Sequence, residues 1–143
     1  MSNKKDKTNH PVVMLIDDSE IDNFINQKMI EGCNFAEQIY IHTSSKSALE
    51  FLKNIEKAGE VSHVLLPKVI FLDINMPIMD GFQFIDEFDK MSKSLSKNCK
   101  IVLLTTSINP SDMERSKNCK YIIQYVNKPL TQEVLDTIKS NLI

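Results

Sequence analysis

The sequence has little cysteine, no strong excess of basic residues and no long hydrophobic run. Its three cysteines, Cys33, Cys99 and Cys119, are odd in number and are not spaced as metal-ligand pairs. We therefore expect reduced thiols, which excludes a disulfide framework and a cysteine-based zinc site. The first apolar run, residues 12–16, is too short for a signal-peptide core or a membrane span. These absences predict a cytoplasmic protein without a membrane segment.

The charge balance also excludes some classes of partner. The formal net charge is -2 at pH 7, with 25% charged and 42% hydrophobic residues. That composition is typical of a globular domain and argues against direct binding to nucleic acid or to a membrane surface. At 143 residues the chain is the size of one domain. Residues 1–10 have almost no apolar side chains to bury, so we expect a disordered tail followed by one folded unit over residues 11–143.

Apolar runs alternate with helical patterns along the chain. Residues 12–16, 69–72 and 101–104 are unbroken apolar runs, which are typical of strands covered on both faces. Residues 38–42 alternate in polarity, as at a sheet edge, and residues 121–126 predict a fifth strand. Five strands that alternate with five helices predict an α/β fold, in which a doubly wound parallel sheet has helices on both faces.

Three local features carry further expectations. After Ser19, which begins the first helix, Ile21, Phe24, Ile25, Lys28 and Met29 recur at helical spacing. Val64, Leu65 and Leu66 are expected to tuck beneath the preceding helix. Pro77 and Gly81 indicate a tight loop after the third strand, with Gly81 free to adopt a positive φ.

Polar side chains follow four of the predicted strands. Parallel strands end at one edge of the sheet, so these side chains should converge there. They are Asp17, Asp18, Asp73, Thr105 and Lys128. Three neighbouring carboxylates repel one another and need a cation to remain ionised together. Hard oxygen ligands without cysteine or a suitably placed histidine point to Mg²⁺, which commonly takes a further oxygen from a phosphate. The sequence therefore predicts a site for a phosphoryl group.

The charge of each side chain predicts its role. Asp73, alone at its strand end, can attack a phosphorus atom and form an acyl phosphate. Lys128 and the metal would neutralise the phosphoryl oxygens, and the Thr105 hydroxyl would donate a hydrogen bond to one of them. The backbone carbonyl of Asn75 is placed to ligate the metal. Taken alone, Asp73 is equally readable as a residue that caps a turn, but the same chemistry at several strand ends argues against that interpretation.

These motifs resemble the response-regulator receiver domain of two-component signalling. The resemblance rests on the Asp17-Asp18 pair, on Asp73 in Leu-Asp-Ile-Asn-Met-Pro, on Thr105 and on Lys128-Pro129, in that order, and covers residues 11–143. It implies a flavodoxin-like sheet with strand order 2-1-3-4-5. It also implies that Lys128-Pro129 is a cis-proline turn.

The resemblance also implies a function. A sensor histidine kinase would transfer a phosphoryl group from its phosphohistidine to Asp73, with Mg²⁺ held by Asp18, Asp73 and the Asn75 carbonyl and with Asp17 assisting. Thr105 and Tyr125 would then rearrange together. The surface formed by the fourth helix, fifth strand and fifth helix would change its affinity for a downstream protein target or a histidine phosphotransfer protein. Such a protein is a phosphoacceptor that catalyses only its own phosphotransfer and dephosphorylation, not an enzyme with a separate substrate.

Two other functions remain open from the residues. A phosphate-ester hydrolase would also use Mg²⁺ and an aspartate nucleophile, but it generally needs an acid two residues later, where this chain has Asn75. A flavin-binding protein of similar fold would need glycines and hydroxyls after the first strand, where Asp17 and Asp18 stand.

Thr106 occupies a position where receiver domains usually have a small residue, so it can narrow access to the phosphoryl group.

Overall fold

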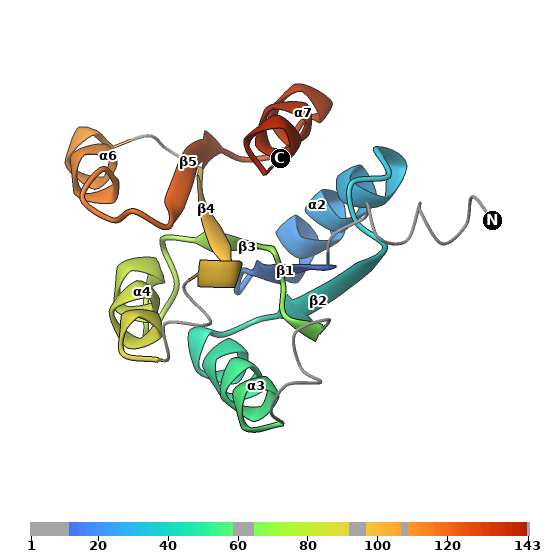
Figure 1. Ribbon diagram of the computed structural model, residues 1–143. Coiled ribbons are helices and arrows are strands. Elements are labelled where there is room, and N and C mark those ends of the chain that lie inside the picture. Colours follow the sequence, from blue (N-terminus) through green and yellow to red (C-terminus); the bar gives the residue numbers. More distant parts are fainter. Residues whose placement is uncertain (1–11, 59–64, 92–96, 107–108, 143) are drawn as a thin grey trace.

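The computed structural model describes residues 12–58, 65–91, 97–106 and 109–142, so the predicted tail lies outside it. Strands and helices alternate along this part of the chain (Figure 1). The strands are β1 (Val12–Ile16), β2 (Gln38–His42), β3 (Val69–Asp73), β4 (Lys100–Thr105) and β5 (Ile122–Asn127). The helices are α2 (Glu20–Gly32), α3 (Ser45–Lys57), α4 (Gly81–Asp89), α6 (Pro110–Ser116) and α7 (Gln132–Asn141).

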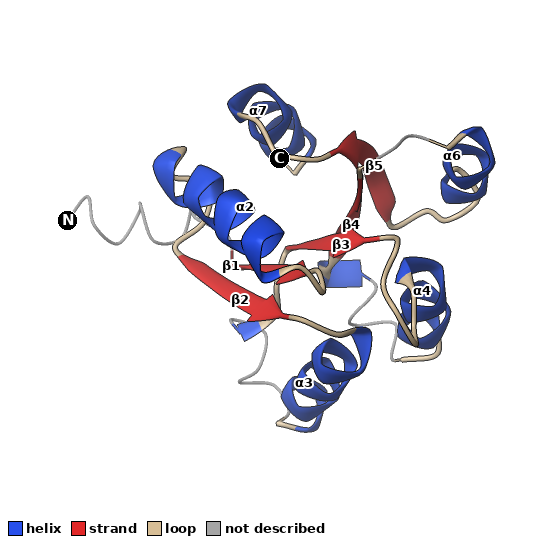
Figure 2. Ribbon diagram, turned by 180° about the vertical axis from the view of Figure 1, so that it is seen from behind, coloured by secondary structure: helices blue, strands red, loops and turns tan. Residues whose placement is uncertain are grey.

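All the strand pairs are parallel, and the sheet order is β2-β1-β3-β4-β5. Helices α3 and α4 cover one face of the sheet, and α2 and α7 cover the other (Figures 1 and 2). This arrangement confirms the predicted doubly wound, flavodoxin-like fold. The strand order reverses between β1 and β3, and open α/β sheets bind ligands beyond the strand ends at such a point.

The side chains of the central strands alternate between two hydrophobic clusters. In β3, Val69 and Phe71 pack in the cluster beneath α2 and α7, whereas Ile70 and Leu72 pack in the cluster beneath α3 and α4. Both faces of the strand are therefore buried, which explains its unbroken apolar sequence. Because successive side chains point to opposite faces, Asp73 continues the row that faces α2.

Helix α2 is present, but most of its apolar residues at helical spacing do not form its buried side. Ile21 is 72% exposed, Phe24 58% and Ile25 45%, and only Ile30 among the aliphatic residues of the helix is fully buried. The inward positions near the start of α2 are occupied by Asn23 and Asn26, which form hydrogen bonds with the loops at the carboxyl edge of the sheet. Hydrogen bonds to these loops, rather than apolar packing, set the orientation of this end of the helix.

Of the two described residues expected to pack before β3, Leu66 does so and Leu65 does not. Leu66 is 7% exposed and belongs to the cluster beneath α3 and α4, but Leu65 is 46% exposed. The Leu65 carbonyl accepts a hydrogen bond from the Tyr40 hydroxyl (2.9 Å), so this segment is held by its backbone rather than by the leucine side chain. Val64 lies outside the described residues.

The loop from β3 to α4 has a backbone different from the expected one. The residue with positive φ is Ile78 (68°), whereas Gly81 is needed for a close approach. The Gly81 N–H donates to the Ile74 carbonyl (2.8 Å), and a Cβ on Gly81 would lie 2.9 Å from the Asp73 carbonyl oxygen. Gly81 thus lets α4 begin directly against the backbone that carries Asp73.

We expect Gly81→Ala to lower the free energy of unfolding by about 1 to 3 kcal/mol, because its Cβ would force two backbone segments apart. Gly32→Ala is the matched control, since a Cβ there meets nothing within 4 Å. Urea denaturation of both variants measures the difference. Equal stability of the two variants would contradict this account of the loop.

Candidate functional site

Three carboxylates lie together at the carboxyl edge of the sheet. Asp17 and Asp18 follow β1, and Asp73 ends the neighbouring strand β3. Each side chain offers an oxygen within 4.8 Å of the others. Asp17 and Asp73 are buried, whereas Asp18 is exposed. The cluster is therefore open to solvent on the side of Asp18 and enclosed elsewhere.

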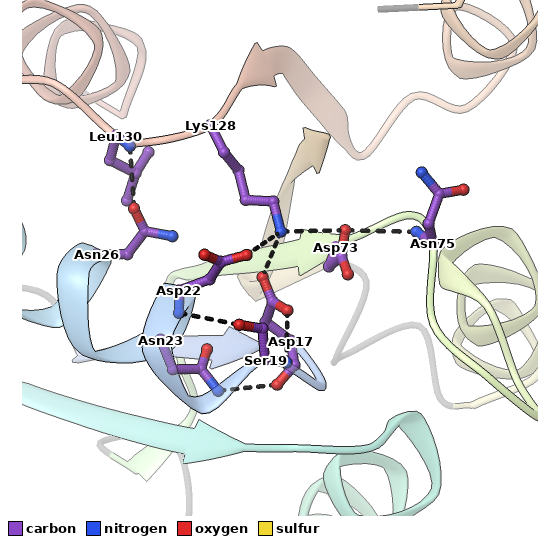
Figure 3. A network of polar contacts seen from close by, with 9 residues as sticks. All are labelled: Asp17, Ser19, Asp22, Asn23, Asn26, Asp73, Asn75, Lys128 and Leu130. Atoms are coloured by element: carbon purple, nitrogen blue, oxygen red, sulfur yellow. Dashed lines mark hydrogen bonds and ion pairs between the residues drawn. The ribbon is translucent and has the colours of Figure 1, made fainter. Parts of the chain in front are cut away.

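Lys128 reaches this cluster from the end of β5, where its peptide bond to Pro129 is cis. Its Nζ lies 2.8 Å from Asp17 Oδ2, 2.8 Å from Asp22 Oδ2 and 3.6 Å from Asp73 Oδ1 (Figure 3). Burial alone would lower the pKa of this amine, but the hydrogen bonds that it donates to Asp17 and Asp22 raise the pKa above its usual value. Lys128 thus remains an ammonium ion at neutral pH.

The charge of Asp73 is poorly stabilised by its surroundings. Burial and the nearby Asp17 carboxylate raise the pKa of Asp73 from 3.8 to about 6, and Lys128 opposes this rise. The Asn75 N–H donates a long hydrogen bond, 3.4 Å, to Asp73 Oδ1. Asp73 is ionised at neutral pH, but few contacts offset its charge. It is therefore suited to bind a cation or to attack an electrophile.

Polar residues of α2 hold the two loops that border the cluster. Asn23 Nδ2 donates to the Asp17 carbonyl (2.8 Å), and Asn26 Oδ1 accepts from the Leu130 N–H (3.0 Å) (Figure 3). These bonds join the loop after β1 to the loop after β5. Each asparagine is buried, and each uses one atom of its side-chain amide for such a bond.

Sequence reasoning missed Asp22, Asn23 and Asn26 as part of the site. An acidic residue such as Asp22 is common in the first turn of a helix, where the helix dipole favours it, so its position alone does not indicate a contact with Lys128. The available signal was their spacing, because positions 22 and 26, and positions 23 and 26, lie on one side of a helix. The neighbouring apolar residues at helical spacing obscured that polar side.

The two predicted switch residues, Thr105 and Tyr125, lie toward the face of the sheet that α3 and α4 cover. Thr105 is buried, and its carbonyl accepts a hydrogen bond from the Lys128 N–H (2.7 Å). Alternation along β4 places Thr105 in the row of Ile101 and Leu103, which pack in the cluster beneath α3 and α4. Tyr125 packs against the same cluster, and its hydroxyl accepts from the N–H of Asn109, the N-cap of α6 (3.4 Å).

The cluster of three carboxylates is suited to bind a divalent cation. Asp17, Asp18 and Asp73 provide hard oxygen ligands from two adjacent strand ends. Among the ion pairs of the described residues, Lys128 is the one cation that contacts this part of the site, where it pairs with Asp17, Asp22 and Asp73. A bound cation would therefore relieve the repulsion between the carboxylates. An anion could bind here only if the charges of both that cation and Lys128 offset its own.

Comparisons with known proteins agree on one family. The model of the response regulator receiver domain matches residues 13–139. The chain is 31% identical to the sensor histidine kinase CheAY of Helicobacter pylori over 127 residues, which is 89% of this chain but 14% of that kinase. It is also 31% identical over 109 residues to the response regulator Rcp1 of Synechocystis sp., which covers 76% of this chain and 71% of Rcp1.

Solved structures show the same fold. A two component response regulator from Cytophaga hutchinsonii superposes with a TM-score of 0.83 at 31% identity, covering 92% of this chain and 95% of that one. The Mn²⁺-bound form of Rcp1 has a TM-score of 0.67 at 24% identity, with 91% and 90% of the two chains covered.

None of the helices among the described residues has both the length and the apolar character that a bilayer span requires.

The raised pKa of Asp73 predicts how stability depends on pH. Between about pH 4 and pH 6, folded Asp73 binds more protons than unfolded Asp73, so the free energy of unfolding should fall as pH rises through this window. Asp73→Asn removes this loss. In EDTA we expect the variant to exceed the wild type by roughly 2 kcal/mol at pH 7.5, and by little at pH 4.

Urea denaturation across this pH range measures the difference. Asp136→Asn, the same change at an exposed position of α7, is the control and should show no such gain. A gap between wild type and Asp73→Asn that stays constant with pH would contradict the assigned cause.

Proposed function

This chain belongs to the response regulator receiver domain family, and we propose on that premise that Asp73 accepts a phosphoryl group from a histidine kinase. Receiver domains act in two-component signalling as phosphoacceptors. The observation that carries the proposal is a buried carboxylate with a pKa of about 6, placed 3.6 Å from the Lys128 ammonium and beside Asp17 and Asp18. It combines a nucleophile with the charges that a phosphoryl group requires.

The proposed transfer is a substitution at phosphorus. A carboxylate oxygen of Asp73 attacks, the bond between phosphorus and the imidazole nitrogen of phosphohistidine breaks, and the electron pair goes to the imidazole. The product is an acyl phosphate on Asp73. At pH values above about 6 Asp73 is ionised and ready to attack. Lys128 would neutralise one oxygen of the transferred group, and the hydroxyl of Thr105 would donate to another.

We assign the metal position to Asp17, Asp18, Asp73 and the backbone carbonyl of Asn75, with Mg²⁺ as the resident ion. The three carboxylates match its preference for oxygen ligands. The existence of an Mn²⁺-bound form of Rcp1, a response regulator of the same fold, supports the binding of a divalent ion. When bound, the ion would supply positive charge that draws the phosphoryl oxygens toward Asp73 and offsets their charge.

We further propose that phosphorylation acts through Thr105 and Tyr125 on the surface formed by α6, β5 and α7. Tyr125 supports this assignment, because its hydroxyl accepts from the first residue before α6, and movement of the ring would release that contact. The change would be a shift between two packings that differ in affinity for a protein.

The proposed partners follow from this chemistry. A sensor histidine kinase supplies the phosphoryl group, and the recipient of the signal is a downstream protein target or a histidine phosphotransfer protein. With a net charge of -2, the chain is assigned no direct role with nucleic acid or membrane. We propose that residues 11–143 form the receiver domain and that it acts in the cytoplasm, as a phosphoacceptor rather than an enzyme with a separate substrate.

The proposal is tested with acetyl phosphate and Mg²⁺. We expect the intact mass to rise by one phosphoryl group in the wild type and not in Asp73→Asn, because the variant lacks the nucleophilic oxygen. Asp136→Asn, at an exposed position of α7, should be labelled like the wild type. Steady hydrolysis of p-nitrophenyl phosphate without an adduct would favour the hydrolase interpretation instead.

A second experiment tests the metal assignment. Asp18→Asn should weaken Mg²⁺ binding by about tenfold or more, since it removes one charged ligand. Asp18 is exposed, so folding should be nearly unchanged. Isothermal titration calorimetry measures the affinity, again with Asp136→Asn as control. Equal affinity of Asp18→Asn and the wild type would remove Asp18 from the ligand set.

A further inference from the structure

Asp22 makes an ion pair that the proposed phosphotransfer does not use. Its Oδ2 lies 2.8 Å from Lys128 Nζ, as close as Asp17 Oδ2, whereas Asp73 Oδ1 lies at 3.6 Å. We propose that Asp22 is a positioning residue that holds Lys128 back from Asp73 and so opposes the phosphoryl-loaded state. This inference rests on the proposed function and adds to it a residue that sets how readily the site is loaded.

The geometry of Lys128 carries the first step. Its ammonium donates short hydrogen bonds to Asp17 and Asp22, but its distance from Asp73 exceeds a hydrogen bond. A phosphoryl group on Asp73 adds negative charge on that side and attracts the ammonium. For Lys128 to move closer, it must loosen its contact with one of the two carboxylates that now hold it.

The surroundings decide which contact is loosened. Asp17 is fixed in place, since its side chain is 1% exposed and its Oδ1 accepts from the Ser19 N–H (2.9 Å). The Asp22 side chain is 33% exposed, and it lines a hollow together with Lys128 and Thr106. Asp22 can therefore be resolvated when Lys128 leaves, whereas Asp17 cannot.

The charge of Asp22 acts in the same direction. Asp22 lies in the first turn of α2, where the helix dipole favours a negative side chain. With Asp17 and Asp73, it makes three carboxylates around one ammonium ion, so part of the positive charge of Lys128 is already compensated before a phosphoryl group arrives. Removing this charge leaves more of the attraction of Lys128 for the loaded Asp73.

Asp22→Asn tests the proposal, because it removes the charge while keeping a side chain of equal size with an oxygen acceptor. The probe is beryllofluoride, an analogue of the phosphoryl group, titrated in excess Mg²⁺ and followed by ¹⁹F NMR. We expect Asp22→Asn to bind it about fivefold more tightly than the wild type, a size typical of a partly exposed ion pair. Asp22→Glu keeps the charge and should remain within twofold of the wild type.

Two further variants separate a local effect from a general one. Glu20→Gln removes a charge from the same turn at an exposed position and should leave the affinity unchanged. In a Lys128→Gln background, Asp22→Asn should have little effect, because the restraint acts through the ammonium.

The outcomes are distinct. No binding of beryllofluoride by the wild type, together with no labelling by acetyl phosphate, overturns the proposed function. Normal binding by the wild type with no gain in Asp22→Asn overturns the inference alone. A similar gain in Glu20→Gln, or a gain that persists without Lys128, would show a general charge effect and also overturns it.

Discussion

One buried ammonium ion shared among several carboxylates is the interaction on which the site depends. Lys128 contacts Asp17 and Asp22 closely and Asp73 at a longer distance. Burial and the neighbouring Asp17 carboxylate raise the pKa of Asp73 to about 6, and Lys128, whose positive charge is also shared with Asp17 and Asp22, only partly opposes this rise. The protein thereby retains an ionised but poorly compensated oxygen. Such an oxygen is a better nucleophile and metal ligand than one held in a complete ion pair.

The parallel sheet makes this arrangement possible without strain at the reacting group. β1 and β3 are neighbours, so Asp17 and Asp73 meet at one edge, while Lys128 arrives two strands beyond β3 on the cis turn after β5. The hydrophobic clusters hold the strands, and Gly81 allows α4 to start against the backbone of Asp73. The acids are thus positioned by apolar packing some residues away, which offsets the cost of bringing like charges together.

Strand positions and the polar residues that follow them were predictable because an unbroken apolar run directly reports burial on both faces. Residues 69–72 are such a run, and Asp73 after it had to leave the core at the carboxyl edge. The orientation of α2 was not predictable in the same way. Periodicity identifies a helix, but not whether Ile21 and Phe24 or Asn23 and its polar neighbours face inward. That choice depends on loops distant in sequence, as the bond from Asn26 to Leu130 illustrates.

The switch proposed above would connect Asp73 to the α6 surface through β4. Lys128 is bonded through its side chain to the acids and through its N–H to the Thr105 carbonyl, while the Thr105 side chain belongs to the opposite row. Helix α6 lies on that side. It is a short helix in which Ser116 is the one buried residue, and the Arg115 guanidinium lies over the Phe82 ring, 4.2 Å from its centroid. A helix with so little buried apolar surface moves at small energetic cost. In the proposed switch, a change of about one ion pair at Lys128 would therefore move α6 more readily than a helix packed as deeply as α4.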